Sequence, residues 1–172
     1  GDVISETETT ILPNPKVVSS PEDFIAQQKM LVSIENTVKE MHESVNQMRS
    51  AKTQLSHYAN LLKDSKNADS LSEKGKELTK RINSWEENLI QAKQKTFQDV
   101  INFNNKLNAQ LIQLKSYIDQ ANPKVTNGAK ERFNDLMNDW QVYKNERDTI
   151  INTEMKAYND LFKALAIPAL IL

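Results

Sequence analysis

The apolar residues between Phe24 and Leu62 recur in alternating steps of three and four, and this repeat constrains the fold more than any other feature. Such spacing places them along one face of an α-helix, and over about five heptads it is typical of helices that pack lengthwise against other helices. The two rows of the repeat are Phe24, Leu31, Val38, Val45, Lys52 and Ala59, and Ile34, Met41, Met48, Leu55 and Leu62. The pattern predicts a helix over about residues 21–65, with Ser20 as its N-cap.

Two further apolar stripes predict helices over about residues 71–121 and 127–166. The first of these stripes contains Trp85 and the second contains Trp140. Between Thr96 and Phe103 the spacing shifts, which we interpret as a stutter inside one continuous helix.

Glycine and proline, at 3 and 5 of 172 residues, are too few for the turns of a β-sandwich or barrel. The prediction is therefore an all-α fold, an elongated antiparallel three-helix bundle with coiled-coil-like packing over residues 21–172. Counting along the three helices gives the expected layers. They place Trp85 level with about residue 51 and with Phe162, and Trp140 level with Leu107 or Leu111 and with Gln28.

The first twenty residues differ from the rest because they are rich in β-branched residues and contain Pro13 and Pro15. Each proline disfavours helix at the residue before it. Residues 1–20 are expected to form an extended linker, or an edge strand that belongs to a preceding β-domain. The apolar end of the chain, residues 167–172, is expected to fold back over the end of the bundle.

The charge balance argues against nucleic acid as a partner, because 22 basic and 23 acidic residues are interspersed along the chain without a basic surplus. No apolar run reaches the length of a membrane span. The absence of cysteine excludes disulfides and thiolate sites, and it leaves the compartment open. The chain lacks an initiator Met and a signal peptide, so we expect a fragment or the mature portion of a longer protein.

The patterns of acidic residues, histidine and serine do not match a known catalytic or metal site. Glu40 and His42 are two residues apart, whereas a helical di-iron site needs a Glu-x-x-His spacing. Glu86 and Glu87 are adjacent acids, and a slim bundle lacks the cleft that glycoside hydrolysis requires. We therefore expect neither enzymatic activity nor a cofactor.

Polar residues at positions of the apolar stripes suggest how the helices are aligned. The layers place Arg147 level with Glu35, and Glu154 level with His42. One hypothesis is that these pairs fix the register of the bundle. The alternative is that the long side chains reach solvent at the rim.

Four asparagines lie at the stutter, although asparagine is a mediocre helix former. They are Asn102, Asn104, Asn105 and Asn108. Two interpretations stay open, a docking face for a partner and a solvated kink in the helix.

Several stretches of the chain resemble the C-terminal region of large secreted bacterial proteins with a sortilin-like BNR-repeat (Asp-box) β-propeller, which are often labelled glycosyl hydrolases. The stretches that carry the resemblance are residues 13–17, 42–49, 93–108 and 167–172, of which 93–108 (KQKTFQDVINFNNKLN) is the most specific. Relatives tend to have proline at the position of Asn104, which supports a kink there.

The resemblance implies that residues 1–20 are the last strand and linker of a preceding β-domain. It also implies export, with a periplasmic, outer-membrane-associated or extracellular location. No catalytic motif of such enzymes matches a position in this chain. The expected function is thus a non-catalytic C-terminal helical domain that serves as spacer, cap or protein-interaction surface, and the expected partners are the preceding domains or another protein. The alternative is a self-standing coiled-coil module that binds a partner helix. If the chain is a C-terminal helical domain of a larger protein, we expect it to be a monomer.

Overall fold

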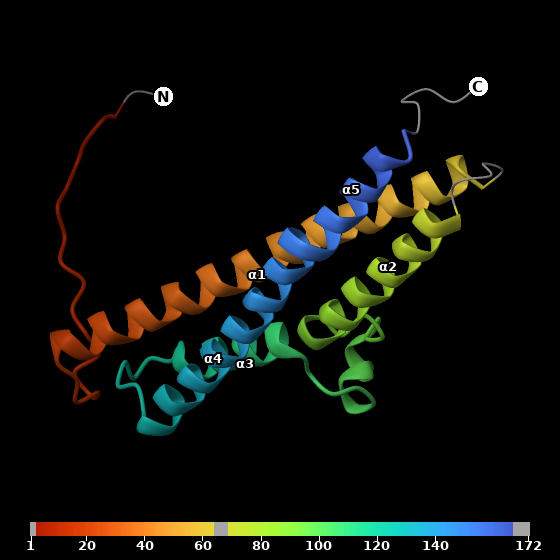
Figure 1. Ribbon diagram of the computed structural model, residues 1–172. Coiled ribbons are helices and arrows are strands. Elements are labelled where there is room, and N and C mark those ends of the chain that lie inside the picture. The colour runs from red at the N-terminus through yellow and green to blue at the C-terminus, as the bar shows by residue number, and fades with distance from the viewer. Residues whose placement is uncertain (1–2, 64–68, 167–172) are drawn as a thin grey trace.

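The computed structural model describes residues 3–63 and 69–166, and within them all regular structure is helical. The four longest helices are α1 (Pro21–Leu61), α2 (Asp69–Leu89), α3 (Leu107–Ile118) and α4 (Asn127–Thr149) (Figure 1). Three shorter elements complete the fold, the 3₁₀-helix η1 (Phe97–Ile101), the π-helix η2 (Ile150–Met155) and α5 (Lys156–Ala164). The all-α prediction is confirmed.

Helix α1 begins where its capping residues predict. The Ser20 hydroxyl accepts from the Asp23 backbone N–H at 3.3 Å, and the Asp23 carboxylate accepts from the Ser20 N–H at 2.9 Å. Pro21 occupies the first turn, where a missing N–H has no cost. The helix then runs unbroken for 41 residues, or about 60 Å at about 1.5 Å per residue.

The prediction of one helix over residues 71–121 is wrong, because the chain leaves the helical path between α2 and α3. Residues 90–106, here called the projecting loop, contain η1 and extend to one side of the molecule (Figure 1). The Asp99 carboxylate accepts from the backbone N–H groups of Lys95 at 2.7 Å and Thr96 at 2.8 Å. Gln91 and Gln94 donate to backbone carbonyls near the other end of the loop. Side chains that bond to the local backbone in this way compete with helix formation.

The third helical stretch agrees closely with the predicted span of 127–166. The Thr126 hydroxyl accepts from the Ala129 N–H at 3.2 Å and caps α4. The helix continues through η2 into α5 without leaving its path. The turn of π-helix was not predicted, and it contains the fully buried Ile150.

The core lies along the contacts of α1 with α2 and α3, of α3 with α4, and of α2 with η2 and α5. Trp85 is 0% exposed and Trp140 is 2% exposed, so both indoles are enclosed as the stripes predict. Residues 3–20 contain a turn at Asn14–Val17 and no strand, and for most of their length they run away from the helices (Figure 1). The predicted fold-back of residues 167–172 lies outside the described residues.

The layers are as predicted between α1 and α2, whereas α4 is shifted along both of these helices. The level of Trp140 with Leu107 or Leu111 stays a prediction. Arg49 and Lys52 contact Glu86, which agrees with the prediction that Trp85 lies level with about residue 51. However, Trp85 Nε1 donates to the Tyr143 carbonyl at 2.8 Å, and Trp140 Nε1 donates to Glu40 at 3.2 Å. The predicted levels, Phe162 for Trp85 and Gln28 for Trp140, are wrong. Because the projecting loop leaves the bundle, α2 and α3 together are shorter than one continuous helix, and α4 lies nearer the C-terminal end of α1.

Candidate functional site

A groove of about 440 Å³ lies between the C-terminal third of α1 and the N-terminal two thirds of α2. We call it the α1–α2 groove. Its lining comes from the end of α1 and the two residues that follow it, from α2 between Asp69 and Asn83, and from Tyr158 of α5. The volume is within the range of sites that hold small molecules.

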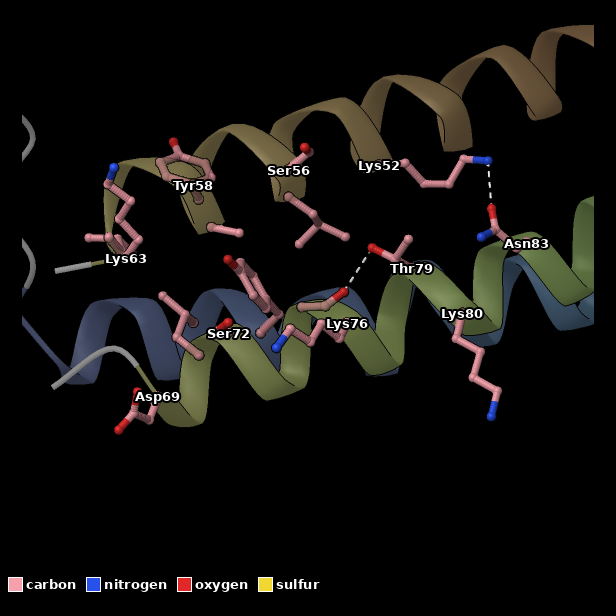
Figure 2. A pocket seen from close by; sticks show the side chains of 16 residues that line it. Lys52, Ser56, Tyr58, Lys63, Asp69, Ser72, Lys76, Thr79, Lys80 and Asn83 are labelled. Carbon is pink, nitrogen blue, oxygen red and sulfur yellow. Dashed lines mark hydrogen bonds between the residues drawn. The ribbon is translucent and has the colours of Figure 1, made fainter. Parts of the chain in front are cut away.

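Lysine predominates among the charged residues of the groove, with Lys52, Lys63, Lys76 and Lys80 against one acid, Asp69. Figure 2 shows Lys80 and Asp69 pointing away from the space between the two helices. Lys52 reaches across one end, where its ammonium donates to Asn83 Oδ1 at 2.7 Å (Figure 2). Lysine side chains therefore outnumber carboxylates in the lining of the groove, although the chain has a net charge of −1.

Tyr158 of α5 packs against α2 at Gly75. A methyl group at Gly75 would lie 3.4 Å from Cε2 of Tyr158 and 3.8 Å from Cδ2 of Leu55, which is ordinary van der Waals contact. The Tyr158 ring is thus packed between α1 and α2 with its hydroxyl 4.0 Å from that position. Burial, with a smaller effect of Tyr58, raises the pKa of the Tyr158 hydroxyl, which is consequently protonated at neutral pH.

Beside the groove, a partly buried carboxylate joins α1 to α2. Glu86 Oε1 lies 2.6 Å from a guanidinium nitrogen of Arg49, and its Oε2 lies 2.8 Å from the Lys52 ammonium. Burial acts to raise the pKa of Glu86, but the hydrogen bonds and charges of Lys52 and Arg49 outweigh it and hold the pKa below its ordinary value. Lys52 at a stripe position is explained by this contact, whereas the sequence pattern did not indicate the role of Glu86.

The predicted register pair Arg147–Glu35 is wrong. Arg147 instead donates to the Ser44 hydroxyl at 2.8 Å, a residue 103 positions earlier, and it also pairs with Asp148 at 2.9 Å. Glu35 pairs with Lys115 of α3 at 2.7 Å. The shift of α4 along α1 that follows from the projecting loop accounts for the change of partner.

The second predicted pair, Glu154 with His42, is wrong for the same reason. Glu154 lies 3.5 Å from Arg81 of α2, and His42 Nε2 lies 3.4 Å from Asn108 Nδ2. Each residue of the two predicted pairs still contacts a residue of another helix. The hypothesis that polar contacts align the helices can therefore be tested on these observed pairs.

The polar group that contacts Trp140 was missed at the sequence level. Glu40 accepts from Trp140 Nε1 and pairs with Lys144 at 2.8 Å. An indole N–H inside a bundle needs a hydrogen-bond acceptor. A glutamate next to the apolar stripe of α1 could have indicated that acceptor. Finding it required the true register of α1 against α4.

The four asparagines do not form one cluster on a helix. Asn102, Asn104 and Asn105 are exposed in the projecting loop, and the half-buried Asn108 lies in the first turn of α3. Near them, Ile101 is 84% exposed and Val100 is also exposed. The helix is interrupted over residues 90–106 and not merely kinked. The docking face stays a prediction.

Among the His, Cys, Asp and Glu residues that the structure describes, no three lie close enough together to hold a metal ion. In the same part of the chain, no helix has both the length and the apolar character that crossing a bilayer requires. Comparison of the sequence and the structure with family models, curated proteins and solved structures finds no match.

Proposed function

We propose that this chain is a non-catalytic helical domain of a larger exported protein, where it follows a β-propeller and serves as spacer, cap or protein-interaction surface. The resemblance of residues 13–17, 42–49, 93–108 and 167–172 to the C-terminal region of propeller proteins supports the proposal. That resemblance also supports export and a periplasmic, outer-membrane-associated or extracellular location.

The observation that carries the proposal is the exposure of apolar side chains in the segment before α1. Five of them are 78–98% exposed, namely Val3, Ile4, Ile11, Leu12 and Val18. Burying side chains of this size stabilises a protein by about 1.5–3 kcal/mol each, so a segment that leaves five in water lacks its packing partner. A neighbouring β-domain would supply that partner, with the segment as its last strand and linker.

The helical part has features that suit a spacer. Helix α1 is about 60 Å long, and polar contacts hold it to α2, α3 and α4 along its length. We further propose that the helices form an elongated three-helix bundle with coiled-coil-like packing. In this bundle α2 and α3 together take the place of one of the three helices. Such a rod would keep whatever it binds at a fixed distance from the propeller.

The alternative function, a self-standing partner-binding module, is favoured by one feature. The projecting loop exposes Val100 and Ile101 next to polar Asn102, Asn104 and Asn105. Scattering combined with mass measurement separates the two functions. A monomeric rod supports the spacer, and a dimer supports the partner-binding module.

The direct test is the reading frame upstream of Gly1 together with hydrogen exchange of the encoded protein. The proposal expects a signal peptide and a propeller, and it expects the amides of residues 3–18 to exchange at least tenfold more slowly in the full-length protein than in this chain alone. A reading frame without a β-domain, or equal exchange in the two proteins, would contradict the proposal.

A further inference from the structure

The Tyr158 hydroxyl lies at the α1–α2 groove without a partner. The residue is 6% exposed, yet no hydrogen bond of its hydroxyl is found within residues 3–63 and 69–166. The Tyr158 ring is enclosed while its hydroxyl oxygen stays accessible, unlike the buried Ser19 hydroxyl. The phenol therefore presents an accessible O–H at the groove that a ligand can bind.

The side chains nearest to this phenol along α2 are donors as well. Ser72 and Lys76 lie one helical turn apart and both line the groove, and Gly75 between them presents no side chain. Neither Ser72 nor Lys76 has a hydrogen bond or an ion pair to another described residue. Lys52, in contrast, is held by Glu86 and Asn83.

Together these groups offer hydroxyl and ammonium donors in a groove with an apolar wall that includes Leu55 and Leu71. Donors of this kind bind oxyanions with charge-assisted hydrogen bonds. We propose that the α1–α2 groove binds a small organic molecule that carries a phosphate or carboxylate group. Lys76 supplies the charge, and Tyr158 and Ser72 supply hydroxyl hydrogen bonds.

The protonation state of the phenol agrees with this role. Burial keeps the pKa of Tyr158 above its ordinary value, so the hydroxyl holds a proton to donate at neutral pH. The site is independent of whether a propeller precedes this chain, and its failure would leave the proposed function untouched.

The test is a titration of the isotope-labelled chain with pyrophosphate and with citrate at neutral pH, followed by the amide resonances of Ser72, Gly75 and Lys76. Glucose, which is neutral, is titrated in parallel. The expected result is a saturable shift with at least one of the two anions and none with glucose. Equal binding of glucose, or no saturable shift with either anion, would overturn the proposal.

Two variants locate the binding. Tyr158→Phe removes only the hydroxyl, and Lys76→Gln removes only the charge, so each is expected to weaken anion binding about tenfold. Tyr117→Phe and Lys130→Gln are the matched controls, because both residues are exposed on other helices. They are expected to bind as the parent chain does. Equal weakening in controls and test variants would show general attraction to surface charge and would contradict the site.

Discussion

Helix α1 and the stretch from α2 to α3 have similar apolar stripes, yet only α1 is continuous. It runs from Pro21 to Leu61, whereas the other stretch is interrupted between Leu89 and Leu107. In α1, polar side chains near the seam bond to other helices. Lys52 donates to Glu86, and Ser44 accepts from Arg147.

In the projecting loop the polar side chains bond mainly to the backbone of their own segment. Gln91 donates to the Asn104 carbonyl at 3.1 Å, Gln94 donates to the Phe103 carbonyl at 3.0 Å, and Asp99 accepts from two N–H groups. The difference teaches that apolar spacing indicates where a helix can pack, whereas side chains that bond to nearby backbone decide whether it continues.

The largest expected loss of stability comes from a buried residue of α2, the first helix of the interrupted stretch. Trp85→Ala is expected to lower the free energy of unfolding by about 3–5 kcal/mol, because the indole is fully buried and also bonds to the Tyr143 carbonyl. Urea denaturation followed by circular dichroism measures it. Val100→Ala in the projecting loop is the control, with an expected change within about 0.5 kcal/mol. Equal losses in the two variants would mean that the loop and α2 are equally important to the core.

The next effect concerns the carboxylate that joins α1 to α2. Glu86→Gln is expected to cost about 1–2 kcal/mol at pH 7, since it removes a partly buried charge from Arg49 and Lys52. The neighbouring Glu87→Gln, on an exposed side chain, is the matched control and is expected to change stability little.

The pH dependence of this difference has a definite sign. The pKa of Glu86 is lowered in the folded state, so its ionised form contributes stability that is fully present above the ordinary value of 4.5. That contribution is lost as the pH falls through the lower folded pKa. Urea denaturation at pH 7 and pH 3 should therefore show the gap between the parent chain and Glu86→Gln closing in acid. A gap of equal size at both pH values would exclude the charge as its cause.

A smaller effect is expected at the start of the continuous helix. Ser20→Ala removes the hydroxyl that accepts from the Asp23 N–H and is expected to cost about 1 kcal/mol, measured by urea denaturation. Ser19→Ala is the neighbouring control, because the Ser19 hydroxyl is buried without a hydrogen-bond partner within residues 3–63 and 69–166. Its removal should leave stability unchanged or slightly raised. A larger loss for Ser19→Ala than for Ser20→Ala would show that the cap does not stabilise α1.

The parts of the fold that local signals determine could be predicted from the sequence. Ser20 caps the helix that it was expected to cap, and both tryptophans are enclosed. The register of α4 against α1 could not be predicted, because it depends on how many residues leave the bundle between α2 and α3. The shift in spacing between Thr96 and Phe103 is compatible with a stutter inside one helix, so spacing alone could not show that residues 90–106 leave the helix.

The candidate site was even less accessible from the sequence. Gly75 was only an isolated glycine, and its meaning depends on Tyr158, which lies far away in the chain and packs against it. Lys52 was recognised as a polar residue in an apolar row, but its partner Glu86 was considered only as one of two adjacent acids. Contacts between distant segments define the groove, and such contacts follow from the register.

The smallest expected effect on global stability separates the projecting loop from the rest of the molecule. Asp99→Ala removes the acceptor for the Lys95 and Thr96 N–H groups, which are exposed and belong to the loop alone. The melting temperature should change less than in Ser20→Ala, while the amides of Asn102 and Phe103, which donate to the Asp99 carbonyl, should exchange severalfold faster. Hydrogen exchange and thermal denaturation of the same sample measure both. A large fall in melting temperature would mean that the loop stabilises the bundle, and the contrast between the continuous and the interrupted stretch would no longer hold.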